Sequence, residues 1–311
     1  MPRKSASVTE WINRYLKEEE PKSKSLIVSV FGDSIAPRAR GIWLGDLIGL
    51  LRPFGVSERL VRTSAFRLIE EDWLAARRDG RRSYYSLTPA GVRRLELACE
   101  RVYTPLQEDW DGAWTMVMIP RAGDSASDRT GLRRELEWEG FASPTPGLMV
   151  HPSANHEALQ QVLVNLGMTD RVAVLRAHAA DNFSTAPINL LISQCWDLGD
   201  ISDRYEKFVE RFKPLRDGPE LPGITPQQAF MIQTLLIHSF RRATLHDPRL
   251  PTSILAPEWP GMHAYALCRQ IYQLTYRKAD VHLQSACETE APPESANRPS
   301  MQIQQRFGGL Q

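Results

Sequence analysis

The sequence lacks the features that membrane-spanning, secreted and metal-binding proteins require. Its longest apolar runs, such as Leu26–Phe31 and Met231–Ile237, are far shorter than the roughly 20 residues that cross a bilayer. The first 24 residues are polar and charged, so no secretion signal is expected. We therefore predict a cytoplasmic protein with no membrane partner and no metal ion. The four cysteines form no CxxC pair and have no histidine at zinc spacing, so we interpret them as reduced structural thiols: Cys99, Cys195, Cys268 and Cys287.

The sequence also lacks a recognisable active site. His151, His156 and His178 follow no metal-binding spacing, and single histidines are usually structural or surface groups. No paired base, activated nucleophile or glycine-rich phosphate loop accompanies them. We predict no catalytic residue, no cofactor and no enzymatic activity.

Net charge is only +1 over 311 residues, but the charge is unevenly distributed. Between residues 21 and 101 there are fifteen Lys or Arg and nine Asp or Glu, and ten of those basic residues lie at or after Arg59. The rest of the chain is consequently acidic. A local basic excess of this kind is typical of a nucleic-acid contact that a whole-chain sum conceals.

The basic segment has the pattern of two helices joined by a short turn. Apolar residues at 44, 47, 48 and 51 predict a buried helical stripe, and Pro53-Phe54-Gly55 ends that helix. Ser57 is a suitable N-cap for a second helix over 57–71. Arginine and threonine share the outer side of that helix, where arginine can read guanine edges in the major groove. The candidate contacts are Ser57, Arg59, Arg62, Thr63 and Arg67.

A hairpin is predicted directly after this helix. The runs 73–77 and 83–87 are β-prone, and Asp79-Gly80 between them is a strong turn signal. Clustered arginines at its tip would repel one another unless a polyanion lay nearby. The candidate wing contacts are Arg77, Arg78, Arg81, Arg82 and Tyr84. Two other interpretations stay open: a solvated surface, or a docking site for an acidic protein.

Segments in two parts of the chain have counterparts in one known protein family. In the basic segment they are Trp43-Leu44-Gly45, the run 58–63, Phe66-Arg67-Leu68 and the run 80–85. Further along they are Arg241-Arg242, the run 246–251 and Trp259-Pro260-Gly261. These segments resemble the PaaX family of phenylacetate-degradation repressors. The resemblance spans roughly residues 24–287 and implies repression of an aromatic catabolic operon, relieved when phenylacetyl-coenzyme A or a related acyl-coenzyme A binds.

The middle of the chain alternates strands and helices in the order β-α-β-α-β, which predicts a ferredoxin-like domain, as the resemblance also implies. Similar folds occur in an endonuclease-like subunit of CRISPR adaptation complexes. Here Ile119-Pro120-Arg121 follows the first strand without a carboxylate, and Asp124 and Asp128 lie in a polar loop. A metal-dependent nucleic-acid-processing enzyme is therefore the less favoured alternative.

We predict an α+β, multidomain fold with five parts. They are an N-terminal extension (1–23), a winged helix-turn-helix DNA-binding domain (24–104), a ferredoxin-like α+β domain (105–180), a helical C-terminal domain (181–287) and a disordered tail (288–311). An apolar stripe over 198–212 could pair with another helix or cover its own core.

The predicted function is a DNA-binding transcriptional repressor that acts on double-stranded operator DNA as a homodimer, because two related heads double the contact with a palindromic site. No residue is assigned to the effector, since Arg241, Arg242, Arg269 and Arg277 have no distinguishing pattern. The alternatives are the metal-dependent enzyme and a winged-helix protein-interaction module.

Overall fold

The structure is a computed structural model that describes residues 7–38, 41–119, 126–178, 188–287 and 303–310, with backbone alone for 188–191. Its internal contacts divide the chain into two compact units. The first combines Met1–Pro105, Tyr205–Leu245 and His263–Gln311, and the second combines Leu106–Arg204 and His246–Met262. The predicted helical C-terminal domain (181–287) is divided between these units, and most of its helices lie in the same unit as the N-terminal segment.

Helix α10 (Pro226–Thr244) explains why both ends of the chain enter the first unit. It buries side chains on every side, including Phe230, Leu236 and Phe240, so other segments must cover it on every side. Helices α2 (Ser23–Val30) and α5 (Pro89–Tyr103) supply part of that cover. The N-terminal helices and α10 therefore form one core rather than two.

The predicted N-terminal extension (1–23) contains a helix of the same core, α1 (Val8–Glu18). Its Trp11 ring lies 5.3 Å from the ring of Phe212 in α9 (Leu198–Asp217), measured between centroids. Phe208 of α9 lies 5.2 Å from Phe240 of α10 in the same way. Of the two interpretations of the stripe over 198–212, the structure supports cover for the chain's own core.

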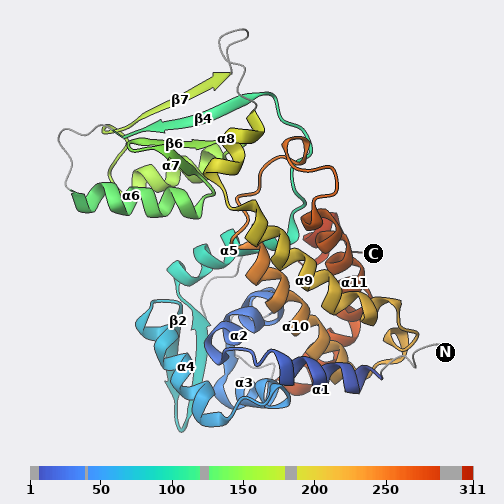
Figure 1. Cartoon of the computed structure of the whole chain (residues 1–311). Helices are drawn as coiled ribbons and strands as arrows, with labels where there is room; N and C mark the ends of the chain where they lie inside the picture. Colours follow the sequence, from blue (N-terminus) through green and yellow to red (C-terminus); the bar gives the residue numbers. More distant parts are fainter. Residues whose placement is uncertain (1–6, 39–40, 120–125, 179–187, 288–302, 311) are drawn as a thin grey trace. The chain divides into compact units, whose positions relative to one another are not determined.

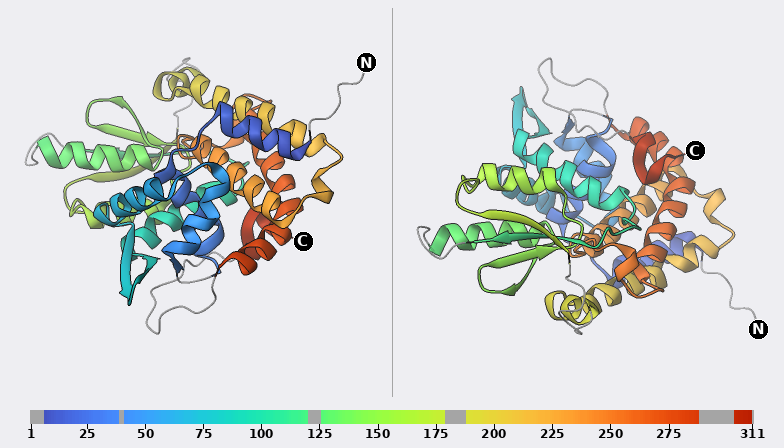
Figure 2. Two further views of the ribbon diagram at one scale, coloured as in Figure 1. Left: turned by 90° about the horizontal axis from the view of Figure 1, so that it is seen from below. Right: turned by 90° about the horizontal axis from the view of Figure 1, so that it is seen from above.

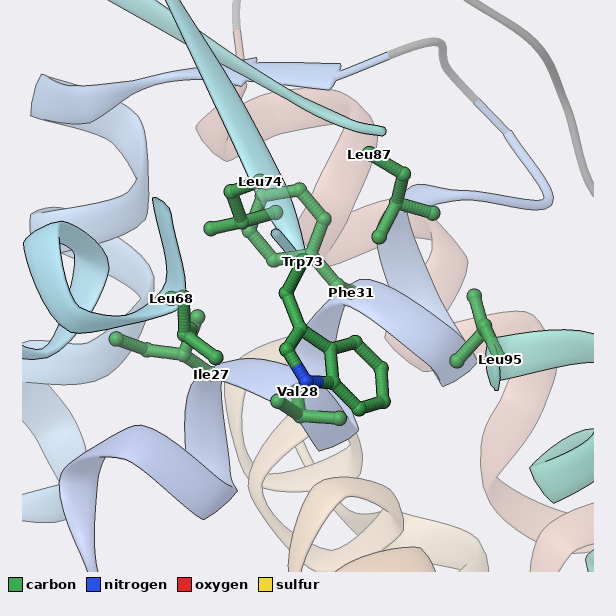
Figure 3. Close-up of a pocket in the computed structure, with 8 residues that line it drawn as sticks. All are labelled: Ile27, Val28, Phe31, Leu68, Trp73, Leu74, Leu87 and Leu95. Carbon is green, nitrogen blue, oxygen red and sulfur yellow. The ribbon is translucent and has the colours of Figure 1, made fainter. Parts of the chain in front are cut away.

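A small apolar core positions helix α4 (Glu58–Glu70) and the hairpin of β2 (Leu74–Asp79) and β3 (Arg82–Leu87). Its side chains surround a cavity of about 10 Å³ (Figure 3), room for one water molecule at most. Every lining residue is apolar, so this cluster fixes the position of α4 rather than holding a ligand. The lining residues are Ile27, Val28, Phe31, Leu68, Trp73, Leu74, Leu87 and Leu95.

The second unit contains a four-stranded antiparallel sheet of β4 (Ala113–Met118), β5 (Ala142–Thr145), β6 (Leu148–His151) and β7 (Ala173–His178). The strand order is β5-β6-β4-β7, in which β4 pairs with both β6 and β7. One side of the sheet packs against α6 (Ala126–Trp138) and α7 (His156–Asn165), which lie together beneath it in Figure 1. On the other side, Trp114 and Val150 pack with Trp196 and Leu250. The predicted strands and helices are present. Strand β5 is an addition, since Ala142–Thr145 has no apolar alternation from which to predict it.

The prediction of a disordered tail (288–311) is wrong for residues 303–310, while 288–302 and 311 lie outside the described residues. Arg306 and Phe307 are each only 1% exposed. Arg306 Nη1 donates to Asp33 Oδ1 at 2.7 Å, and Nη2 donates to the carbonyl oxygen of Gly32 at 3.1 Å. Composition gave no sign of this order, because two side chains in a polar segment make the contacts.

Asp33 lies in the π-helix η1 (Phe31–Ile35) and accepts hydrogen bonds from residues of the first unit that are distant in sequence. Tyr103 and Tyr272 donate to Oδ1 at 2.7 and 2.9 Å, and Gln233 Nε2 donates to Oδ2 at 2.6 Å. Burial raises the pKa of Tyr103 and Tyr272 above the usual tyrosine value, so both keep the proton that they donate. The Arg306 guanidinium carbon lies 4.3 Å from the centroid of the Tyr103 ring.

No helix in the described part of the chain is long and apolar enough to cross a membrane. The four cysteines are free thiols, and burial raises the pKa of Cys99 to about 11, which keeps it protonated. The remaining elements are β1 (Gly41–Trp43), α3 (Leu44–Leu51), η2 (Arg52–Phe54), α8 (Ile188–Cys195), η3 (Leu221–Gly223), η4 (Thr252–Ile254), α11 (Pro260–Ala286) and η5 (Ile303–Gly308).

Candidate nucleic-acid interface

Helix α4 has one buried and one exposed side. Val61, Ala65 and Leu68 are at most 1% exposed and anchor the helix in the core of the first unit. The predicted helix over 57–71 is confirmed to within a residue at each end. The candidate base-contacting residues Ser57, Arg59, Arg62, Thr63 and Arg67 are all exposed, as predicted for the outer side.

The turn before α4 fixes where the helix begins. Gly55 has a φ of +79°, a left-handed conformation that favours glycine, and it ends the short helix η2. Ser57 Oγ accepts from the Leu60 backbone N–H at 3.4 Å and caps the new helix. The Ser57 hydroxyl therefore has a structural role at the exposed N-terminal end of α4, whether or not it also contacts DNA.

Two of the candidate side chains on α4 already have partners in the helix. Arg62 Nη2 and Nε donate to Glu58 Oε1 at 2.7 and 2.9 Å, in a pair whose side chains are more than half exposed. Such exposed pairs contribute only about 0.3–0.5 kcal/mol, so Arg62 can exchange Glu58 for another acceptor at little cost. Thr63 Oγ1 donates to the Arg59 carbonyl oxygen at 2.9 Å, which leaves its lone pairs and methyl group available.

Phe66 is a member of this surface that the sequence analysis did not assign. It lies on the exposed side of α4 and is 59% exposed, and Leu60 on the same helix is 48% exposed. The signal was present in the sequence, because Phe66 falls on the polar side of the helical wheel, opposite Val61 and Leu68. An aromatic residue is easily counted as core when only its chemistry is considered.

The hairpin after α4 has the predicted position but a turn shifted by one residue. Asp79 pairs with Arg82, so the two-residue turn is Gly80-Arg81, with Gly80 at a φ of +56°. Figure 2 shows the hairpin projecting from the helices. Because cross-strand partners share a face, Arg77 and Arg82 lie on one face and Arg78 on the other. The four arginines are all exposed, but they surround the tip rather than form one patch.

Tyr84 is a correction to the predicted wing contacts. Its side chain is 4% exposed and meets Trp43 edge-on, with ring centroids 5.2 Å apart. Tyr84 therefore belongs to the core beneath the hairpin and is not available to DNA. Arg82 is exposed, yet its guanidinium carbon lies 4.1 Å from the Trp43 ring centroid, so this arginine is partly held by a cation–π contact.

His151 and His156 of the second unit have structural contacts. His151 is 3% exposed; its Nε2 donates to the Pro248 carbonyl oxygen at 2.8 Å, and Nδ1 accepts from Ser153 N–H. Thr115 Oγ1 lies 3.2 Å from His156 Nε2. Within the described residues, no group of three or more His, Cys, Asp or Glu side chains could hold a metal ion. The loop with Pro120, Arg121 and Asp124 lies outside the described residues. Asp128, which was predicted in that loop, lies in the first turn of α6 instead.

Two of the four arginines considered for the effector, Arg241 and Arg242, bond to other residues of the chain. Arg241 donates to the Ser25 hydroxyl at 2.9 Å, and Arg242 donates to Glu19 at 3.2 Å. A cavity of about 360 Å³ along Ser193–Gly199 has the volume for part of a ligand. Its lining contains no arginine or lysine, so it lacks the cations that coenzyme A phosphates would require.

Comparisons with known proteins find similarity to one protein family along most of the chain. Three family models match consecutive segments: "PaaX-like protein" at residues 22–91, "PaaX protein central Cas2-like domain" at 107–187 and "PaaX-like protein C-terminal domain" at 196–285. The transcriptional repressor PaaX of Escherichia coli (strain K12) is 38% identical over 290 residues, which cover 92% of this chain and 90% of that protein. A solved structure, the uncharacterized protein Rv0674 from Mycobacterium tuberculosis, is 22% identical with a TM-score of 0.47 and covers 76% of this chain and 89% of its own.

Proposed function

The chain belongs to the PaaX family of transcriptional repressors, and we propose that it binds double-stranded operator DNA through a winged helix-turn-helix. In this proposal α3 and α4 are the two helices, and the β2–β3 hairpin is the wing. The Cas2-like central segment has the β-α-β-β-α-β order of a ferredoxin-like domain. We propose a regulator that works in the cytoplasm and is not an enzyme.

The observation that carries this proposal is the exposed side of α4 beside an arginine-rich hairpin. Arg59, Thr63 and Arg67 project from the helix without any role in its packing. A recognition helix enters the major groove with its N-terminal residues at the base edges, and Arg59 lies in the first turn. Arginines around the hairpin tip suit flanking phosphates or a minor groove.

We propose that the functional form is a homodimer. One winged helix contacts only a few base pairs, whereas two related by a two-fold axis match a palindromic operator. The regulated genes, in this proposal, are those of phenylacetate-type catabolism. An aryl-acyl-coenzyme A such as phenylacetyl-coenzyme A releases the repressor by binding its DNA-free conformation more tightly, with a coupling of about 1–3 kcal/mol.

The test is a titration of the full chain onto duplexes selected from a random pool, followed by fluorescence anisotropy at fixed salt. We expect a selected fragment to bind at least a hundredfold more tightly than a scrambled one. Phenylacetyl-coenzyme A should release it and free phenylacetate should not. Selective binding without release would reject the effector alone, and equal binding to all fragments would reject the DNA-reading function.

A variant ties this result to α4. Arg62→Ala removes a side chain that can leave Glu58 for a guanine edge, and loss of a bidentate base contact costs about 1–3 kcal/mol. The affinity for the selected fragment should fall by about 5- to 150-fold per half-site, while binding to scrambled DNA changes much less. Arg133→Ala is the matched control, because Arg133 makes the same exposed i,i+4 pair, with Glu137 on α6. Equal effects of the two variants would remove Arg62 from the interface.

A further inference from the structure

Phe66 has the largest exposed fraction, 59%, of the large hydrophobic side chains in the described part of the chain. Helix α4 does not need this ring for its own packing, since Val61, Ala65 and Leu68 already fill its buried side. A residue that is 59% exposed gains little from folding and leaves apolar area in contact with water. A binding contact would account for this exposed ring.

The neighbours of Phe66 indicate what kind of surface it meets. Residues three, four and seven positions away share a side of a helix. Before Phe66 these are Thr63, Arg62 and Arg59, which are all exposed. After it they are Ile69, Glu70 and Trp73, of which only Glu70 is exposed. A ring with cationic and hydroxyl groups on its N-terminal side suits a polyanionic partner that also offers a small apolar group. Double-stranded DNA has that chemistry, since the thymine methyl group is an apolar group among the polar atoms of the major groove.

We propose that Phe66 contacts the C5-methyl group of a thymine in the operator and makes the repressor selective for thymine at that position. This inference rests on the proposed function, because it requires α4 to lie in the major groove. At about 1.5 Å per residue, Phe66 lies about 10 Å along α4 from Arg59, so the two side chains would contact different base pairs.

Thr63 supports this assignment. Its hydroxyl hydrogen is directed to the Arg59 carbonyl oxygen at 2.9 Å, so the Thr63 side chain also presents its methyl group and lone pairs rather than a free donor. Between Arg59 and Phe66 the outer side of α4 thus changes from a guanidinium to an apolar ring. The proposal predicts a half-site in which a guanine-type contact is followed by a methyl-dependent one.

The experiment replaces each thymine of the selected fragment by deoxyuridine, one symmetric pair at a time. Deoxyuridine keeps the base pairing and lacks only the methyl group, so the change isolates that contact. Burial of one methyl group corresponds to about a fourfold change in affinity per half-site. We expect one position at which wild-type affinity falls by about fourfold or more per half-site and at which Phe66→Ala shows no loss.

Two variants keep the result interpretable. Phe66→Leu retains an apolar side chain and should retain most of the methyl sensitivity. Trp138→Ala removes another exposed aromatic ring, 47% exposed on α6, and should leave the deoxyuridine profile unchanged. Because Phe66 is exposed, its variants should keep the unfolding midpoint of the wild type.

The outcomes separate this inference from the proposed function. A methyl-sensitive position that disappears in Phe66→Ala supports the contact. Selective binding with no sensitivity to deoxyuridine, or with equal sensitivity in both proteins, overturns the contact and leaves the repressor function intact. Unchanged DNA binding by Phe66→Ala also overturns it. Loss of all sequence selectivity in the wild-type protein overturns the proposed function and this inference together.

Discussion

Asp33 and Arg306 form a buried ion pair between the N-terminal and C-terminal parts of the chain. Both side chains are 1% exposed, and the atoms that pair are 2.7 Å apart. Burying two charges is costly unless hydrogen bonds satisfy the rest of each group. Tyr103, Tyr272 and Gln233 supply those bonds to the carboxylate. The stability of the pair therefore depends on these neighbouring donors as well as on the two charges. Removing either charge alone leaves the other buried without its partner.

We predict that Arg306→Ala lowers the free energy of unfolding by about 3–5 kcal/mol, because it leaves the Asp33 carboxylate buried without its cation. Urea denaturation measures the change. Asp33→Asn in the same background should recover part of the loss, since the unpaired charge is then gone. Arg133→Ala breaks an exposed pair on α6 and should change stability by at most about 0.5 kcal/mol. A similarly small change in Arg306→Ala would show that the pair is not formed.

At the scale of the element, the hairpin and α4 should contribute differently to DNA binding. Contacts to phosphate act on every sequence and release counterions, whereas contacts to base edges act on particular sequences. Arg81 occupies the turn of the hairpin, while Arg82 lies over Trp43. Arg81 is therefore the better probe of a phosphate contact that is independent of the hairpin's own packing.

Arg81→Ala should reduce the slope of log affinity against log salt by about one unit for each lost phosphate contact. The loss should be equal for selected and scrambled fragments, because phosphates carry no base sequence. Binding isotherms at four or five salt concentrations provide the slope, with Arg134→Ala on α6 as an exposed arginine remote in sequence. A slope equal to that of the wild type would remove the hairpin tip from the interface.

Elements with strong local signals were predictable from the sequence. The helix over 57–71 has a capping serine and clear periodicity, and the hairpin has Asp79-Gly80, so both could be placed to within a residue or two. Strand β5 could not be predicted, because Ala142–Thr145 pairs with β6 but has no strand pattern in its own sequence. Tyr84 shows the same limit at a single position: the strand was predictable, but which tyrosine faces Trp43 depends on register with β1.

Contacts between distant parts of the chain were beyond the reach of local patterns. Residues 303–310 are polar enough to predict disorder, yet Arg306 finds its partners 273 positions away at Asp33. The merging of the N-terminal segment with α10 has the same cause. Periodicity shows that a helix has apolar sides, but it does not show which other segment will cover them.

At the scale of the whole molecule, His238 should make stability depend on pH. It is 2% exposed in α10, lies 3.1 Å from Ser29 Oγ through Nδ1, and has a pKa lowered to about 3 by burial and then by Arg241 and Arg242. Between pH 6.5 and about 3 the unfolded chain therefore binds a proton at this position that the folded chain does not. The contribution is complete above pH 6.5 and is lost as the pH falls.

We expect the folded state to lose about 1.4 kcal/mol per pH unit from this residue below pH 6.5. Urea denaturation at pH 7.5, 6.0 and 5.0 measures the total slope, and the difference between wild type and His238→Gln isolates the histidine. Glutamine keeps a group that can bond to Ser29 but does not titrate. Parallel pH profiles for the two proteins would mean that His238 takes up a proton as readily in the folded chain as in the unfolded chain, and would contradict this prediction.

The pairing of Asp33 with Arg306 also sets an order of events during synthesis. The carboxylate is made 273 residues before the guanidinium that neutralises it. At about 5–20 residues per second, the ribosome needs about 15–55 seconds to cover that distance. Until then the Asp33 carboxylate lacks the cation with which it pairs. Helix α10, which supplies Gln233, is also absent for most of that time. The first unit is thus completed late, after all the residues of the second unit have been made.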